Sequence, residues 1–317
     1  MSKIPISLLI DDGAPRVSVY YHHAKSLFTS KGDPLVSEIP NDFLYEFYDV
    51  VSKYGIKGKL SIVPMPIGKN KSNVADGIDG FDQTEIKEWL DFVKTNVSKN
   101  FSFSPEMLTH NVALDVKSGE FLEERENDWA NHQKKEALTP YISYALEILK
   151  RAGFDINGVS SPWNFGAAVE DEYVPALSDA LYNVYGKRDV WYALHSHYGN
   201  HAAWPQVMLD RDGRRVVRFV CTVGDIFGNP DNILTEDGKG GELREVLDAG
   251  GCPVILTHWQ SLFSNGSRNG LHTLSEVAKR IEKNFGDSLE WITADELMRR
   301  TLNKLIKKPP GRRFFYL

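Results

Sequence analysis

The sequence has very little cysteine and no long apolar run. Only Cys221 and Cys252 occur among its 317 residues, which argues against a disulfide scaffold or a cysteine-based metal site. The apolar stretch over residues 4–10 is interrupted by a proline and a serine. It is too short for a membrane-spanning helix or for the centre of a signal peptide. We therefore expect a cytoplasmic protein with no membrane partner, or an exported one whose signal is missing from this sequence.

An excess of positive charge and phosphate-binding loops are also missing. The formal net charge is −6, whereas binding to nucleic acid needs a basic face. Neither a Gly-x-Gly-x-x-Gly nor a Gly-Lys-Ser/Thr motif occurs. A solvated helix end and tail explain the basic residues near the C-terminus better than a nucleic-acid site does. We therefore expect no nucleic-acid partner and no nucleotide cofactor.

What the sequence does contain is an alternation of strand-like and helix-like segments, in a composition typical of globular proteins. Strands are predicted at residues 4–10, 59–63, within 106–114, and at 158–161, 190–194, 216–223, 254–257 and 289–293. Amphipathic helices are predicted between them. This order favours an α/β fold, a distorted TIM-like (β/α) barrel with seven or eight parallel strands in one domain over residues 1–317. An open parallel sheet is the alternative. Residues 224–241 are predicted to form a surface loop.

Polar residues follow several of the predicted strands. Asp11 and Asp12 follow the first strand, His110 follows the third, and His258 follows the seventh. Catalytic groups of a parallel barrel gather at the C-terminal ends of its strands, so we expect these residues to share one pocket. Adjacent carboxylates perturb each other's pKa, and imidazole titrates near neutrality. A polar Asp-Gly turn is the simpler explanation of the first pair alone.

These segments resemble the polysaccharide deacetylases, a family of metal-dependent carbohydrate esterases with a distorted barrel. Residues 9–13, Leu-Ile-Asp-Asp-Gly, resemble the family's Thr-Phe-Asp-Asp-Gly motif, and residues 255–258 resemble the late strand that carries its acid histidine. The resemblance implies that Asp11 is the general base, that Asp12 and His110 bind a divalent metal ion, with zinc expected, and that His258 is the general acid.

Weaker likenesses supply candidates for contacts with the substrate. Residues 160–163, Ser-Ser-Pro-Trp, resemble the family's Arg-x-Pro-Tyr/Trp segment, and residues 189–191 loosely match its Asp-Trp segment. Aromatic rings pack on sugar faces, although barrel rims also bury such rings. The candidate substrate-binding residues are Trp163, Pro162, Trp259, His22 and His197.

Two departures from the family pattern concern the metal and the base. Aligned from His110, the motif His-Ser/Thr-x-x-His has Leu114 in place of its second histidine. The third ligand is therefore not identified, with Asp115, His22 and His197 as possible substitutes. The family's arginine beside the base is replaced by Ser160, although such a cation would lower the pKa of Asp11 and orient it.

The resemblance predicts a hydrolase that removes an acyl group from a carbohydrate or hydrolyses a C–N bond in a carbohydrate or small amide. One alternative is a catalytically decayed barrel that binds carbohydrate without turnover, favoured by the missing histidine and arginine. Another is a glycosidase that uses Glu106 and Asp11 as its two carboxylates. The sequence predicts neither the substrate nor the oligomeric state.

Overall fold

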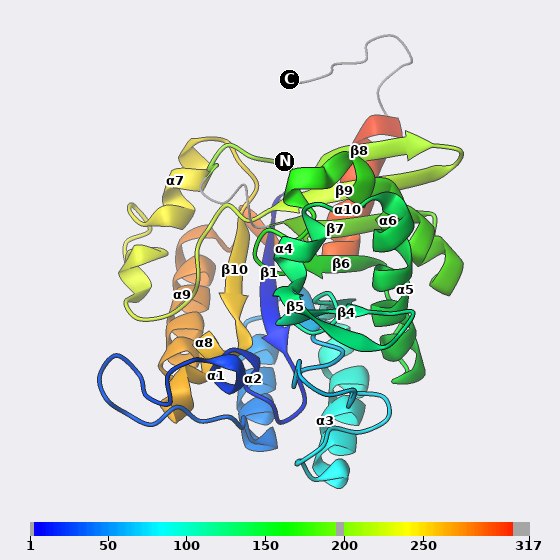
Figure 1. Cartoon of the computed structure of the whole chain (residues 1–317). Helices are drawn as coiled ribbons and strands as arrows, with labels where there is room; N and C mark the ends of the chain where they lie inside the picture. The colour runs from blue at the N-terminus through cyan, green and yellow to red at the C-terminus, as the bar shows by residue number, and fades with distance from the viewer. Residues whose placement is uncertain (1–2, 195–199, 307–317) are drawn as a thin grey trace.

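The computed structural model describes residues 3–194 and 200–306 and shows a first sheet organised around β1 (Ile4–Gly13) (Figure 1). The parallel strands β10 (Val254–His258) and β2 (Gly58–Ile62) flank β1, and β3 (Phe101–Pro105) pairs with β2. A short strand, β11 (Leu289–Trp291), pairs with the beginning of β1. The first predicted strand is thus the central one, and all its partners run parallel to it.

The second sheet contains four strands in the order β6-β7-β9-β8. β6 (Gly158–Ser161), β7 (Asp189–Leu194) and β9 (Arg214–Val220) are parallel, whereas β8 (Gln206–Arg211) runs antiparallel to β9. Isolated bridges link the two sheets, between Glu106 and Ser160 and between Val223 and Ile255. The predicted α/β class with parallel strands is confirmed. Within the described residues, single bridges and no continuous ladder join the two sheets, so the expected closed barrel is not shown.

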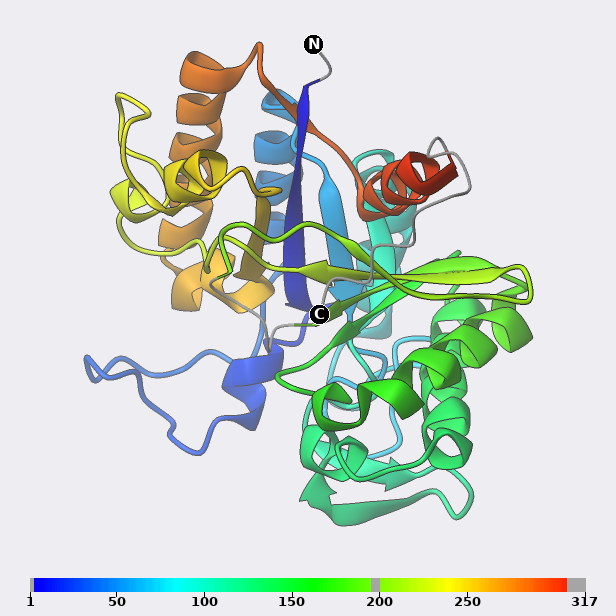
Figure 2. The same ribbon diagram turned by 90° about the horizontal axis from the view of Figure 1, so that it is seen from above.

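Helices cover the outer sides of the sheets, with α2 and α9 beside β1 and β10 and with α5 and α6 beside the second sheet (Figure 2). The helices of the described part of the chain are α1 (Val19–His23), α2 (Asn41–Lys53), α3 (Gln83–Thr95), α4 (Glu126–Ala130), α5 (Lys135–Arg151), α6 (Glu170–Tyr185), α7 (Glu242–Asp248), α8 (Trp259–Phe263), α9 (Asn269–Phe285) and α10 (Ala294–Ile306). None of them is long and apolar enough to cross a bilayer.

Local sequence explains why these elements form. In α2, Phe43, Leu44 and Phe47 recur at helical spacing and are fully buried. Asp82 caps α3 by accepting hydrogen bonds from the first backbone amides of that helix. Gly58 opens β2 where a Cβ atom would meet the carbonyl oxygen of Leu8 at 1.7 Å, so only glycine lets the two strands approach here.

The region after α3 differs from the prediction. The third strand lies at Phe101–Pro105 rather than within residues 106–114. It alternates phenylalanine with serine, and both faces are buried. Residues 112–125 form an antiparallel hairpin of β4 (Val112–Asp115) and β5 (Glu120–Arg125) instead. His110 therefore lies in the loop between β3 and β4, at the same end of the sheet as Asp11.

Candidate active site

The first-sheet strands bring the predicted catalytic residues together. Asp11 and His258 are direct neighbours across the parallel ladder of β1 and β10, and adjacent strands lie about 4.8 Å apart. Asp11 is fully buried, whereas the His258 side chain is 32% exposed. The two groups thus face each other at the C-terminal ends of their strands, one enclosed and one open to solvent.

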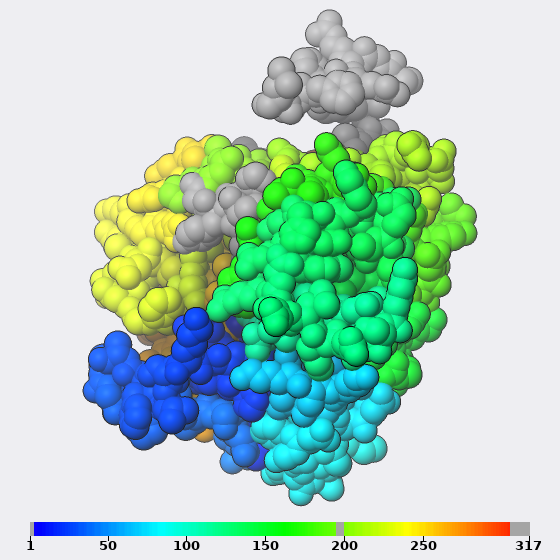
Figure 3. Space-filling view, in the orientation of Figure 1, coloured from blue at the N-terminus to red at the C-terminus, as the bar shows by residue number. Residues whose placement is uncertain are grey.

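These strand ends form the floor of a cavity of about 440 Å³. In the space-filling view a hollow lies on this face, between the dark blue segment after β1, the yellow segment around α7 and the green segments (Figure 3). The residues that line the cavity are Asp11, Asp12, Tyr20, Tyr21, Glu106, His110, Trp163, Asp225, Leu256, His258, Gln260 and Ser261. Acidic, imidazole and aromatic side chains therefore meet in one solvent-accessible space.

Three of the lining residues form a buried cluster suited to a cation. The ligand atoms of Asp12, Glu106 and His110 all lie within 4.8 Å of one another. The His110 Nε2 atom is 2.8 Å from Asp12 Oδ1 and 3.5 Å from Glu106 Oε1. The other Asp12 oxygen, Oδ2, accepts a hydrogen bond from the Gln260 amide. Two carboxylates and an imidazole are a donor set that divalent transition metals accept.

The backbone of the cluster is held in an unusual conformation. Asp12, His110 and Trp163 have positive φ angles of 61°, 53° and 49°, a region that costs about 1–3 kcal/mol for such residues. Glu106 stabilises the first of these by accepting a hydrogen bond from the Asp12 amide. Glu126 stabilises the second, because its buried carboxylate accepts from the amide of His110 at 2.6 Å. Strain of this kind is typical of functional sites.

Burial and charge shift the pKa values of the cluster in different directions. Burial alone would raise the pKa of Asp12, but the neighbouring His110 holds it well below its usual range. Burial and the charges of Asp11 and Asp12 raise the pKa of Glu106. Burial would lower the pKa of His110, yet the two carboxylates raise it well above 6.5. A proton on His110 thus offsets part of the negative charge, and a bound cation would displace that proton.

Asp11 has a buried cation beside it. The Lys59 ammonium group, which comes from β2 and is fully buried, contacts Asp11 Oδ1 and donates to Ser160 Oγ at 2.6 Å. Ser61 Oγ lies 3.2 Å from the same Asp11 oxygen. Lys59 thus places a positive charge beside Asp11, and Ser160 contacts that charge through its hydroxyl.

His258 has a carboxylate beside it. Asp225, from the segment after β9, lies 2.8 Å from His258 Nδ1. The Asp225 oxygens also accept hydrogen bonds from Thr257 at 2.8 Å and Ser261 at 2.9 Å. Burial would lower the pKa of His258, but the hydrogen bond to Asp225 and the nearby charges of Asp12 and Asp11 raise it to about 9. The imidazole is therefore protonated at neutral pH.

The predicted substrate-binding residues lie in different environments. Trp163 lines the cavity, is 39% exposed and packs against His110 with ring centroids 4.3 Å apart. Pro162 is buried just before it. Trp259 is fully buried against Phe43 and does not line the cavity, so the prediction that it contacts substrate is wrong. His22 lies on α1 but does not line this cavity, and His197 lies outside the described residues.

Two further carboxylates considered in the sequence lie away from the cation cluster. Asp115 does not join the metal cluster, because its carboxylate binds Lys117 and Ser118 in the turn of the β4–β5 hairpin. Asp189, from the loose Asp-Trp match, forms a bidentate ion pair with Arg215 in the second sheet instead of reaching the cavity.

Sequence reasoning missed Lys59 and Asp225, and it considered Glu106 only as a glycosidase carboxylate and not as a metal ligand. Glu106 lies four positions before His110. If His110 is aligned with the second histidine of the family's His-Ser/Thr-x-x-His motif, Glu106 therefore takes the place of the first histidine. Lys59 was visible only as a charged residue in an otherwise apolar strand. Asp225 had no local signal, because it lies in the segment of residues 224–241 that was predicted to be a surface loop.

Comparisons with solved structures identify the fold of the chain. No protein-family model matches the chain, and no curated protein matches it in sequence. A structure assigned as a polysaccharide deacetylase from Mycobacterium smegmatis is similar, with a TM-score of 0.51 at 11% identity over 100% of this chain and 96% of that one. The chain therefore has the fold of a polysaccharide deacetylase, as its motifs predicted.

Two other solved structures are similar at a lower level. A structure assigned as a polysaccharide deacetylase from Pseudomonas aeruginosa PAO1 has a TM-score of 0.49 at 11% identity, over 95% of this chain and 91% of that one. A 4-alpha-glucanotransferase from Thermococcus litoralis has the same TM-score and identity, also over 95% of this chain. The chain spans only 41% of the length of that glucanotransferase.

Proposed function

We propose that this protein is a metal-assisted hydrolase of the deacetylase type, which removes an acyl group from an amino sugar or a related amide. The observation that carries the proposal is the arrangement in one cavity of a three-residue cation cluster, a carboxylate beside a lysine, and an imidazole beside an aspartate. These groups supply an electrophile site, a base and an acid, which amide hydrolysis requires.

Asp12, Glu106 and His110 would hold the metal ion. Their ligand atoms are close enough to share one cation, and all three side chains are buried. Their carboxylate and imidazole donors suit zinc, cobalt, nickel or manganese. When bound, such an ion would polarise the scissile carbonyl and acidify water at the site. Gln260 orients Asp12 from the opposite side, so the ligand carboxylate is fixed in place.

Asp11 acts as the general base. The Lys59 charge and the Ser61 hydroxyl favour its ionised form, which is the form that can accept a proton from the attacking water. Lys59 is a positioning residue here, because it touches the base and is enclosed away from the cavity. Lys59 on β2 would therefore supply the charge that the family resemblance expected from an arginine at position 160.

His258 acts as the general acid. It is protonated at neutral pH, it faces Asp11 across the ladder, and its exposed edge reaches the cavity. It therefore can donate a proton to the departing amine. Asp225 fixes the orientation of the ring through Nδ1, which leaves Nε2 for the leaving group.

The glycosidase alternative is disfavoured by the position of its two carboxylates. Ser61 Oγ donates to Glu106 Oε2 at 2.6 Å and lies 3.2 Å from Asp11 Oδ1. The two acids are almost fully buried around one shared hydroxyl, so a glycosidic bond does not fit between them as a glycosidase would require.

The test is acetate release from an N-acetylated oligosaccharide by protein supplied with zinc, cobalt, nickel or manganese. Replacing Asp11→Asn should lower turnover by roughly 10²–10⁴-fold, while the metal-dependent rise in melting temperature persists. The matched control is Asp115→Asn, a carboxylate outside the cluster, which should leave both readouts unchanged. Unaltered turnover in Asp11→Asn would remove Asp11 from the base role. Protein that gains neither stability nor activity with any of the metals would instead favour the decayed, sugar-binding alternative.

A further inference from the structure

A second cavity of about 680 Å³ opens beside the first and shares four residues with it. The shared residues are Tyr20, Tyr21, His110 and Trp163, so the second cavity, called the groove below, continues directly from the first. The rest of the second cavity is lined by the segment after α1 and by the loop and hairpin around β5. Its remaining lining residues are His23, Ala24, Lys25, Ser26, Phe28, Thr29, Ser30, Leu35, Asn111 and Arg125. A substrate reaching beyond the cluster would lie here.

The lining of this second cavity carries cations without any carboxylate. It includes Lys25 and Arg125 but no aspartate or glutamate, although the whole chain has a net charge of −6. The positive charge of the groove therefore comes from Lys25 and Arg125.

The pairing of Arg125 sets it apart from most other arginines. Within residues 3–194 and 200–306, the arginines other than Arg125 and Arg188 have a carboxylate oxygen within 4.0 Å of a guanidinium nitrogen. Arg188 lies over Tyr182 at the far end of β7. Arg125 lies over the ring of Trp163 with its guanidinium carbon 5.4 Å from the ring centroid, and it faces the groove.

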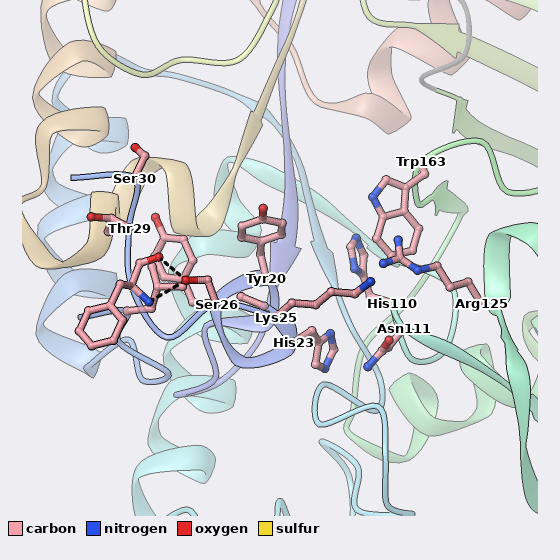
Figure 4. Close-up of a pocket in the computed structure, with 14 residues that line it drawn as sticks. Tyr20, His23, Lys25, Ser26, Thr29, Ser30, His110, Asn111, Arg125 and Trp163 are labelled. Atoms are coloured by element: carbon pink, nitrogen blue, oxygen red, sulfur yellow. Dashed lines mark hydrogen bonds between the residues drawn. The ribbon is translucent and has the colours of Figure 1, made fainter. Parts of the chain in front are cut away.

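The position of these side chains shows where an anion would bind. In Figure 4, Lys25 extends across the cavity toward Arg125, and His110 lies beside them. Trp163 packs between the guanidinium and His110, so it connects the groove to the cation cluster. The ring holds the guanidinium in place, and an arginine held in this way binds a carboxylate through two parallel hydrogen bonds.

We propose that the groove binds a carboxylate-bearing sugar unit next to the unit that is hydrolysed, with Lys25 and Arg125 as its anion partners. This proposal rests on the proposed function, and it names the class of substrate as an acidic N-acylated oligosaccharide. Trp163 and Tyr20 provide aromatic faces for sugar rings. Ser26, Thr29 and Ser30 line the groove with hydroxyl groups that can bind sugar hydroxyls.

The test compares two ligands that differ only in charge. One is a tetrasaccharide that alternates N-acetylhexosamine with hexuronic acid, and the other is the same molecule with its carboxyl groups reduced to alcohols. Calorimetry on the metal-loaded protein should show at least about tenfold tighter binding of the acidic form, which corresponds to about 1.4 kcal/mol. The preference should fall as salt is raised, because salt screens exposed charges. Replacing Lys25→Gln together with Arg125→Gln should abolish it.

The control variant is Arg188→Gln, which removes the other arginine that lies over a ring without a carboxylate partner and should keep the preference. Equal binding of the two ligands, or a preference that survives the double substitution, would overturn the proposal. Tighter binding of a sulfated neutral analogue than of the uronic acid form would overturn the assignment to a carboxylate. Binding is measured without turnover. A protein that prefers the acidic ligand but releases no acetate would therefore contradict the proposed function and not this inference.

Discussion

The two walls of the active-site cavity present groups of opposite charge, and each of these groups is stabilised by a neighbour of the other sign. The β1–β2 wall presents Asp11 to the cavity, and behind it Lys59 and Ser61 place a cation and a hydroxyl beside this carboxylate. The β9–β10 wall, made of Asp225, His258 and Ser261, places a carboxylate beside an imidazole. The first wall is enclosed, whereas the His258 ring is partly exposed. The Asp11 carboxylate is thus shielded from solvent, whereas the His258 ring is open to exchange its proton with solvent.

The largest expected effect comes from removing the Lys59 cation of the enclosed wall. Replacing Lys59→Met removes the cation beside a fully buried carboxylate, and loss of one partner of a buried pair costs about 3–5 kcal/mol. Urea denaturation should show this as a loss of unfolding free energy. The double variant Lys59→Met with Asp11→Asn should recover most of the stability but not the activity, because no buried charge is then left alone. A single variant as stable as the wild type would contradict the pairing.

The next effect concerns the cluster between the walls. At a metal concentration a hundred times the dissociation constant, binding should stabilise the fold by about 2.7 kcal/mol, measured as a rise in melting temperature that a chelator reverses. Replacing Glu106→Gln should remove most of this gain, because an amide is a weaker ligand than a carboxylate. The same substitution keeps an acceptor for the Asp12 amide, so stability without metal should change little. An undiminished metal response would exclude Glu106 as a ligand.

A third effect concerns how the protonation of His258, in the exposed wall, depends on pH. Asp225 helps to raise the pKa of His258 from 6.5 to about 9, so the acid form persists into alkaline solution. Replacing Asp225→Asn should move the alkaline limb of the kcat profile to lower pH. The stability that the pair provides is fully present below pH 6.5 and is lost as pH rises through about 9. The stability difference between wild type and variant should therefore shrink over that interval. An unmoved alkaline limb would mean that His258 is not the titrating acid.

The smallest effect comes from one hydrogen bond of the exposed wall. Ser261→Ala removes the bond from Ser261 Oγ to Asp225 and should cost about 1 kcal/mol of unfolding free energy. Asp225 keeps its contacts with His258 and Thr257, so the alkaline limb should stay close to that of the wild type. A shift as large as that of Asp225→Asn would show that Ser261 has a greater part in orienting the ring.

The order of elements could be predicted from the sequence because most strands and helices carry a strong local pattern. Residues 4–10 and 254–257 are short apolar runs that end in polar residues, and the structure pairs them side by side with Asp11 facing His258. The likeness of the Asp-Asp-Gly segment to a family motif then located the floor of the cavity. These inferences needed only neighbours in sequence and the rule that parallel strands end together.

Residues whose partners come from distant segments could not be predicted in this way. Asp225 lies in a glycine-rich stretch, and its contact with His258 depends on how the chain returns from β9 to β10. The part that Lys59 plays depends on its contacts with Asp11 and Ser160, which lie on other strands. β3 was misplaced because a pattern of alternating Phe and Ser looked less apolar than the residues after it, although both of its faces are buried.

The register between β1 and β10 has a consequence for how this site can change. The spacing of Asp11 and His258 is set by main-chain hydrogen bonds of the ladder, not by the side chains of the groove. The segments that carry Lys25 and Arg125 can therefore vary to accommodate other ligands while the distance between the proposed proton acceptor and the proposed proton donor stays constant. The sheet thus separates the evolution of selectivity from that of reactivity, and a designer could exchange the groove without rebuilding the chemistry below it.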